Sequence, residues 1–119
     1  RLWKVTADGG KESQLTGLKP EKEQVEETWP HWSPDGKWIA MQRRVGNNTD
    51  VWIYEVATGA AFPLTSFGDC SKPTWSYDGK SIWFTRFKNA KESIWVATDL
   101  TLTPPRAVKK TSAKRPTKR

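Results

Sequence analysis

Pro30-His31-Trp32-Ser33-Pro34-Asp35-Gly36-Lys37 is the stretch that decides the fold, because it returns as Pro73-Thr74-Trp75-Ser76-Tyr77-Asp78-Gly79-Lys80, displaced by 43 positions. The apolar positions that follow it repeat with the same displacement, as Ile39 and Ile82 do. Self-similarity at a fixed period of this length is the signature of repeat architectures. The sequence therefore predicts two copies of one structural module.

The start of the chain carries part of a further module. Leu2-Trp3-Lys4-Val5 is similar to Val51-Trp52-Ile53-Tyr54, and Gln14-Leu15-Thr16 is similar to Pro63-Leu64-Thr65, both with an offset of 49. We therefore expect the chain to begin within a repeat. Residues 1–28 are predicted to form the outer strands of an incomplete module and a polar, exposed connector.

Each module is predicted to contain four short strands. Ser33-Pro34-Asp35-Gly36 indicates a tight turn, since proline presets φ, aspartate caps the turn and glycine takes the left-handed position. The first module covers 29–71, with strands at 29–33, 38–43, 51–56 and 61–65. The second covers 72–108, with strands at 73–76, 81–87, 93–98 and, after a turn lengthened by two prolines, a divergent last strand at 106–110. A basic disordered tail at 109–119 is expected to follow.

The predicted strands are apolar at consecutive positions, as in Trp38-Ile39-Ala40-Met41, whereas a half-exposed antiparallel strand would alternate. Their sheets are therefore expected to be covered on both faces. Four-stranded antiparallel sheets of this period, packed face to face, describe the blades of a β-propeller. The predicted fold class is all-β, a partial β-propeller, and we expect most of the following residues in its core: Trp3, Trp32, Trp38, Trp52, Trp75, Trp83 and Trp95.

The repeated phrases also resemble a known family. Trp32 to Ile39 and Trp75 to Ile82, followed by an apolar third strand and Leu64-Thr65, are similar to the WD-like repeats of TolB-type β-propellers over residues 1–108. The resemblance implies a propeller. It leaves open whether the whole protein is a periplasmic TolB, a peptidase of the prolyl oligopeptidase type with a non-catalytic propeller, or a sensor domain. A six-bladed ring needs roughly 260 residues, so we expect either further chain or copies of this one, such as a homotrimer, to complete it.

Composition restricts the partners. The 119 residues carry a formal net charge of +7, but 109–119 contribute six cations and no acid, so the repeats are nearly neutral. Nucleic acid is therefore not expected to bind except through this tail. Cys70 is the single cysteine, which excludes an internal disulfide, and no apolar run approaches the roughly 18 residues of a membrane span. The resemblance favours a periplasmic or extracytoplasmic location, with a cytoplasmic one left open.

Residues for catalysis are scarce. His31 is the only histidine, and Thr74 takes its place in the second module. Cys70 has no base that the sequence places beside it, and no Gly-x-Ser-x-Gly segment supplies a hydrolase nucleophile. One histidine and one cysteine do not make a zinc site of ordinary composition. We therefore predict a protein that is not an enzyme and that has no catalytic, metal or cofactor residue.

What the sequence leaves is a binding surface. In a propeller the loops vary without disturbing the sheets, and we expect the links between modules and the turns between second and third strands to reach opposite ends of the ring. Candidates at one end are His31, Asp69, Ser71 and Lys72, and at the other Asn47, Asn48, Asn89 and Lys91. Repeated cations late in the second strands would form a positive lip: Arg43, Arg44, Arg86 and Lys88. The predicted partner-binding residues are His31, Arg43, Arg44, Asp69, Lys72, Arg86 and Lys88.

The functional hypothesis is a non-enzymatic protein-interaction scaffold that binds a partner through its ring ends. The alternative is a propeller that gates substrate for a peptidase domain outside this chain. Sugar binding by exposed tryptophans and nucleic-acid binding by the basic tail are two further hypotheses.

Overall fold

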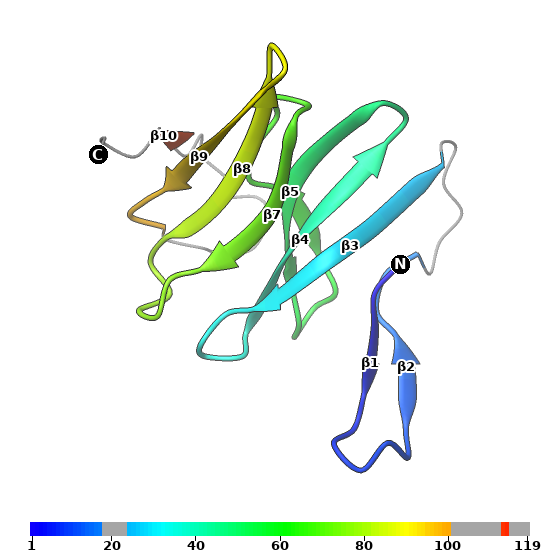
Figure 1. Cartoon of the computed structure of the whole chain (residues 1–119). Helices are drawn as coiled ribbons and strands as arrows, with labels where there is room; N and C mark the ends of the chain where they lie inside the picture. The colour runs from blue at the N-terminus through cyan, green and yellow to red at the C-terminus, as the bar shows by residue number, and fades with distance from the viewer. Residues whose placement is uncertain (18–23, 101–112, 115–119) are drawn as a thin grey trace.

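The computed structural model describes residues 1–17, 24–100 and 113–114. The described residues form ten β-strands and no helix, which confirms the all-β prediction (Figure 1). The strands are β1 Trp3–Val5, β2 Glu12–Gln14, β3 Val25–Trp32, β4 Trp38–Val45, β5 Asn48–Glu55, β6 Ala61–Pro63, β7 Cys70–Trp75, β8 Ile82–Lys88, β9 Lys91–Ala97 and β10 Ala113–Lys114. In this part of the chain, no helix is long and apolar enough to cross a membrane.

The strands form two antiparallel sheets of four strands and one two-stranded hairpin. The order is β3-β4-β5-β6 in the first sheet and β7-β8-β9-β10 in the second, while β1 pairs with β2. Each sheet follows the chain, so every strand is paired with its sequence neighbour. The register repeats as well, since His31 pairs with Ala40 and Thr74 pairs with Trp83. The 43-residue module is therefore a four-stranded antiparallel blade.

The turn after each first strand is fixed by a serine and an aspartate. Ser33 Oγ donates to Asp35 Oδ1 at 2.6 Å, and the Lys37 N–H donates to the same oxygen at 3.0 Å. Ser76 and Asp78 repeat this arrangement, with a serine-to-aspartate distance of 2.7 Å. The serine hydroxyl, followed by the backbone N–H, holds the pKa of each aspartate below its ordinary value. Both aspartates stabilise turns, as the sequence predicts.

The Leu-Thr pairs at the ends of blades also repeat in three dimensions. The Leu2 N–H donates to Thr16 Oγ1 at 2.9 Å, and the Val51 N–H donates to Thr65 Oγ1 at 3.0 Å. Each threonine hydroxyl donates in turn to a carboxylate, that of Glu27 or Asp50. The hairpin β1–β2 therefore matches the outer strands of a blade, as the offset of 49 predicts.

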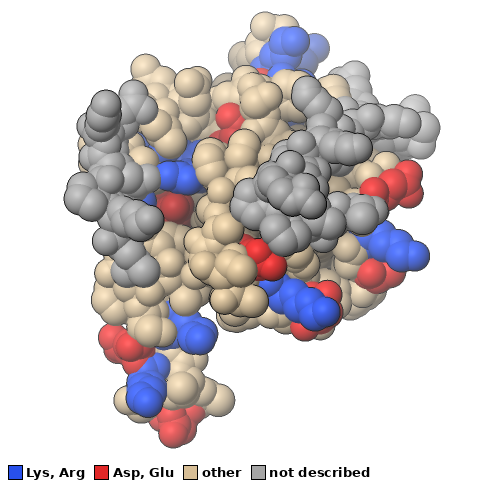
Figure 2. Space-filling model, turned by 180° about the vertical axis from the view of Figure 1, so that it is seen from behind, with Lys and Arg blue, Asp and Glu red and all other residues tan. Residues whose placement is uncertain are grey.

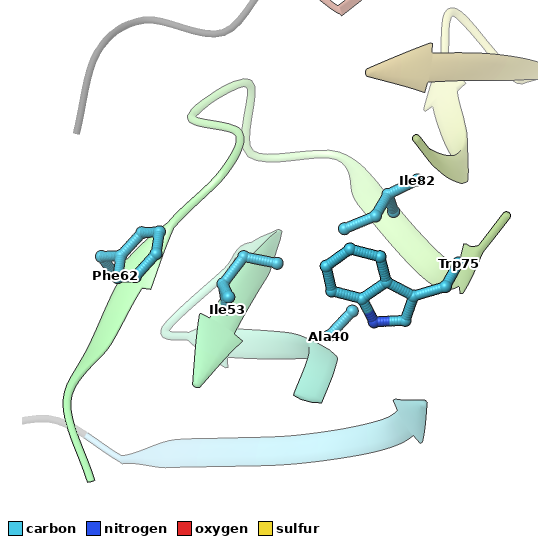
Figure 3. Packing of buried hydrophobic residues seen from close by; sticks show 5 residues of the cluster. All are labelled: Ala40, Ile53, Phe62, Trp75 and Ile82. Carbon is cyan, nitrogen blue, oxygen red and sulfur yellow. The ribbon is translucent and has the colours of Figure 1, made fainter. Parts of the chain in front are cut away.

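The two blades pack face to face through a cluster that both sheets supply. Figure 3 shows the Trp75 indole between Ala40 of the first blade and Ile82 of its own blade, with Ile53 beside it. The opposite face of the first blade packs against the β1–β2 hairpin through Leu2, Ile39, Met41 and Tyr54. The first blade is thus covered on both faces, as the apolar runs predict.

The second blade is covered on one face only in the described structure. Trp83, Phe87 and Ile94 lie on the side away from the first blade, with exposed fractions of 42%, 57% and 57%. Trp83 stands where the first blade has Ala40, the small residue on which Trp75 packs. The outer surface of the second blade therefore differs in shape from the surface that the first blade offers to its neighbour.

The expectation that most of the seven tryptophans named above lie in the core holds only in part: Trp75 lies in a core cluster and Trp38, Trp52 and Trp95 pack against one, but the others do not. Trp75 is buried, Trp38, Trp52 and Trp95 are half-buried, and Trp3, Trp29, Trp32 and Trp83 are exposed. Trp32 holds the position of Trp75 in the first blade and pairs with Ile39, so it faces the side where only the outer hairpin β1–β2 is described. A consecutive apolar run shows that both faces of a strand avoid water, but it does not say which part of each face is covered.

Strand boundaries differ from the predicted domain boundaries. The first blade begins at Val25, within the predicted polar connector, because Glu27 is buried against the Arg1 side chain and the Thr16 hydroxyl. The second begins at Cys70, which lies in β7 instead of in a link.

The last strand of the second blade also differs from the prediction. Strand β10 pairs Ala113 with Ala97, as Ala61 pairs with Tyr54 in the first blade. Pairing to the free edge of β9 makes these two residues strand, where a disordered tail is predicted, because an open edge offers unpaired backbone groups. The predicted strand at 106–110, the lengthened turn and the other residues of the tail lie outside the described residues.

Candidate functional site at the link end

One end of the blade pair collects most of the predicted binding residues. We call it the link end, defined by the inter-blade link 66–69 and the turns at 46–47 and 89–90. The Thr49 N–H donates to the Gly68 carbonyl at 3.2 Å, and the Phe87 N–H donates to the Asp69 carbonyl at 3.0 Å. The prediction that links and second-to-third turns reach opposite ends is therefore wrong. Four alternating strands return the chain to the end at which the blade began.

The predicted residues divide between the link end and the blade interface. His31 lies near the far end of β3, where it contacts Trp75 of the neighbouring blade. The turns Ser33–Lys37 and Ser76–Lys80 mark this opposite end, which we call the hairpin end. The structure brings the other candidates together at or beside the link end: Arg43, Arg44, Asn47, Asn48, Asp69, Ser71, Lys72, Arg86, Lys88, Asn89 and Lys91.

Arg86 and Asp69 fasten the link to the second blade. Arg86 Nε donates to Asp69 Oδ1 at 2.8 Å, and its Nη2 donates to Oδ2 at 3.1 Å. The guanidinium carbon lies 3.9 Å from the centre of the Phe67 ring and 4.9 Å from that of Trp95. These two hydrogen bonds hold the pKa of Asp69 below its ordinary value and raise the pKa of Arg86. Arg86 is only 9% exposed, so its charge is used within the blade.

The first blade repeats the arginine–aromatic contact, with a carboxylate from a different position. The Arg43 guanidinium carbon lies 4.2 Å from the centre of the Trp52 ring, and Arg43 Nε is 3.7 Å from Glu27 Oε2. Arg43 and Trp52 match Arg86 and Trp95 at the displacement of 43. Sequence reasoning found both arginines but not their partners, because the carboxylates come from first strands or links far away in the chain. The repeated Arg-Trp spacing was the available signal for this cation–π unit.

Other charged and aromatic side chains at the link end remain accessible. Arg44 forms a half-exposed ion pair with Glu26, with Nη2 and Oε1 2.6 Å apart. Lys72, Lys88 and Phe67 are exposed. Figure 2 shows blue and red atoms interspersed on the face seen from behind, with blue atoms at the upper tip, where the β8–β9 turn lies in Figure 1. This end therefore offers cations and aromatic rings on a framework whose deeper ion pairs are satisfied internally.

Cys70 is not exposed at this surface. Its thiol is fully buried, and this burial raises its pKa to about 12. The nucleophilic thiolate is therefore scarce at neutral pH. Within the described ranges, no group of three or more His, Cys, Asp or Glu side chains could hold a metal ion.

A cleft of about 530 Å³ lies at the hairpin end between the two blades. Its walls include Trp38, Trp75 and Leu100, and its rim carries Asp35 and Asp78. Both aspartates have a lowered pKa and accept turn hydrogen bonds. They are therefore ionised at neutral pH and are not suited to act as general acids.

The repeated four-stranded meanders, the face-to-face packing and the repeated turns and Leu-Thr closures define the class of the chain. It is built from β-propeller blades.

Comparisons with known proteins agree with this class. No family model matches the chain. It is 41% identical over 69 residues to the uncharacterized peptidase YuxL of Bacillus subtilis, which covers 56% of this chain and 10% of YuxL. It is 39% identical over 54 residues to the Tol-Pal system protein TolB of Francisella tularensis, which covers 44% of this chain and 12% of that protein. The matched segments thus span about a tenth of the length of these relatives.

Solved structures extend the likeness over most of the chain. TolB from Acinetobacter baumannii superposes with a TM-score of 0.69 at 24% identity, covering 93% of this chain and 25% of that one. A putative TolB from Agrobacterium tumefaciens gives 0.70 at 25% identity, covering 93% and 35%. An acylaminoacyl peptidase gives 0.53 at 17% identity, covering 76% and 18%. The blades are therefore TolB-like, as the resemblance of the repeats indicates.

Proposed function

We propose that these blades form part of a non-enzymatic scaffold that binds a protein partner through the link end. The observation that carries the proposal is the architecture of this end. Accessible cations and aromatic rings, among them Lys72, Lys88 and Phe67, lie beside the internally paired Arg86 and Asp69. A surface supported by satisfied ion pairs on strands holds its binding groups in place. The likeness to TolB proteins, one of which is described as a Tol-Pal system protein, supports a protein-interaction role.

Further propeller blades are a second class of partner under the same proposal. The exposed Trp83, Phe87 and Ile94 lie on the face of the second blade that corresponds to the covered face of the first. Large apolar patches of this kind mark interaction sites. Either more blades of the same protein or a second copy of this chain would cover them. Light scattering of the 119-residue chain separates the two, since a closed ring of copies gives a discrete small oligomer.

The location that goes with this function is the periplasm or another extracytoplasmic compartment. The support is the likeness to TolB proteins. A fusion of the full-length protein to a reporter that folds only outside the cytoplasm tests it.

Partner capture tests the proposed function. The chain is immobilised, captured proteins are identified by mass spectrometry, and one identified protein is then purified and its affinity measured. We expect Lys88→Glu with Arg44→Glu to weaken this affinity at least about tenfold, because steering charges of the binding end are reversed. Lys37→Glu with Lys80→Glu changes the same charge at the hairpin end and is expected to have little effect. Equal losses in both pairs, or none, would contradict binding through the link end.

The second candidate is a propeller that positions substrate for a peptidase domain outside this chain. The specific observation in its favour is the 41% identity to the peptidase YuxL. This candidate predicts that the full-length protein contains a Gly-x-Ser-x-Gly segment followed by Asp and His, and that it hydrolyses acylated peptides. If the full-length protein lacks such a segment and shows no hydrolysis, the peptidase candidate is excluded and the scaffold proposal stands.

A further inference from the structure

The first strands of the two blades share an uncommon backbone feature. The pairing register shifts between Thr28 and His31 in β3, and between Ser71 and Thr74 in β7, so each strand has a β-bulge. Trp29 and Lys72 occupy the bulges with the same positive φ of 55°. Non-glycine residues with a positive φ are conformationally strained and cluster at functional sites.

The backbone repeats at these bulges, but the side chains do not. Trp29 and Lys72 are matched by the displacement of 43, so the blade accepts either residue there. Both are exposed, and Lys72 Nζ lies 5.9 Å from the centre of the Trp29 ring. Among the described residues, no carboxylate lies within ion-pair distance of Lys72. Neighbouring blades therefore bring an accessible aromatic face and an accessible ammonium group together.

A residue of the first blade fixes the second bulge. The Lys72 N–H donates to Gln42 Oε1 at 3.0 Å, and Gln42 lies on β4 of the neighbouring blade. Because this hydrogen bond crosses the blade interface, it couples the position of Lys72 to that of Trp29. We regard Gln42 as a positioning residue.

We infer that Trp29 and Lys72 form a recognition site for an acidic segment of a partner protein. The Lys72 ammonium pairs with a carboxylate, and the Trp29 ring packs against a neighbouring flat or apolar side chain of the same segment. β3 is an edge strand whose outer edge can accept an extended peptide, whereas the N–H groups of Lys72 and Trp75 on β7 already donate to the first blade. This inference rests on the proposed function and names the chemistry of the partner.

The experiment uses the 119-residue chain and two synthetic octapeptides, one of alternating Glu and Tyr and one of alternating Gln and Tyr. Isothermal titration calorimetry is expected to show binding of the Glu peptide only, weakened by salt. Lys72→Gln is expected to lower the affinity about tenfold, whereas Lys72→Arg keeps most of it. Trp29→Leu is expected to lower it about fivefold. Gln42→Ala is expected to lower it less than Lys72→Gln does, because the ammonium group remains.

The matched controls are Lys80→Gln and Trp3→Leu, which remove an exposed lysine and an exposed tryptophan from other parts of the chain. Both are expected to bind the Glu peptide within about twofold of the unaltered chain. Circular dichroism confirms that each variant is folded. Equal binding of the two peptides, or equal loss in Lys72→Gln and Lys80→Gln, would overturn the inference. So would Lys72-dependent binding of an acidic trisaccharide by a chain that does not bind the Glu peptide.

Failure of this inference is distinguishable from failure of the proposed function. If a captured partner still binds through Lys88 and Arg44 while Lys72→Gln and Trp29→Leu leave its affinity unchanged, the scaffold stands and this site is wrong. If the Glu peptide binds through Lys72 but reversing Lys88 and Arg44 leaves the affinity of every captured protein unchanged, the recognition chemistry stands and the proposed scaffold role is wrong.

Discussion

Trp75 donates two hydrogen bonds to His31 of the neighbouring blade. Its backbone N–H lies 3.0 Å from His31 Nδ1, and its indole Nε1 lies 3.0 Å from the His31 carbonyl oxygen. The only histidine of the chain thus has an interface role, and it accepts a hydrogen bond from a strand edge that would otherwise be unpaired. Trp75 also packs between the blades, so this one residue contributes both hydrogen bonds and apolar contacts to the blade interface.

Replacing His31 tests this contact. His31→Ala removes the acceptor and leaves the Trp75 N–H unsatisfied in a partly buried place, so we expect the free energy of unfolding to fall by about 1–2 kcal/mol. His31→Asn places an oxygen near the position of Nδ1 and is expected to recover most of this loss. Urea unfolding followed by circular dichroism measures both. Equal destabilisation by Ala and Asn would show that the hydrogen bond is not the cause.

The ion pair of Arg86 is more buried than that of Arg44, so we expect the loss of each arginine to lower the free energy of unfolding by a different amount. Arg86→Gln is expected to lower the free energy of unfolding by roughly 2 kcal/mol, because Asp69 is left with an incompletely solvated charge and two rings lose their cation. Arg44→Gln breaks a half-exposed pair and is expected to cost at most about 0.5 kcal/mol. Thermal and urea unfolding of the two variants compare them. A larger loss from Arg44 would contradict the structural role given to Arg86.

Cys70 predicts a dependence of stability on alkaline pH. The pKa of its thiol rises from 9.0 to about 12 on burial, so between these values the folded chain binds more protons than the unfolded one. Its contribution to stability is complete below pH 9 and is lost as the pH rises toward 12. Cys70→Ala is expected to lack this part of the pH dependence. In the unaltered chain, a thiol reagent at pH 8 is expected to react only after unfolding, and rapid labelling of the folded chain would contradict the burial.

Ala40 and Trp83 occupy equivalent positions in the two blades, so placing a tryptophan at position 40 tests the blade interface. Ala40→Trp puts an indole where Trp75 already packs, and we expect a loss of roughly 3 kcal/mol in the free energy of unfolding. Ala57→Trp, in an exposed turn, is the matched control and is expected to be nearly neutral. A stable Ala40→Trp variant would mean that the blades can separate or repack without cost.

Local chemistry explains what the sequence could predict. Ser33, Asp35 and Gly36 lie within one turn, so their spacing defines a hairpin regardless of the rest of the chain. The Leu-Thr pair also acts within one blade, since the Thr65 hydroxyl accepts a hydrogen bond from the Val51 N–H of the neighbouring strand. These signals were sufficient for strand order and for the propeller class.

Contacts between distant segments explain what it could not predict. The bulges at Trp29 and Lys72 depend on register, and Gln42 bonds Lys72 from another blade. Burial of a tryptophan likewise depends on which neighbour covers it. The positions of the links and turns, in contrast, followed from strand direction and could have been derived by counting strands.

Site-specific photo-crosslinking of the full-length protein in its native host tests the central claim most directly. A photoreactive phenylalanine derivative is placed at Lys88, on the link end, or at Tyr77, the fully exposed residue at the hairpin end. We predict that illumination joins a distinct partner protein to the variant at position 88 and not to the variant at 77. An adduct only at position 77, or the same adducts at both, would contradict binding through the link end.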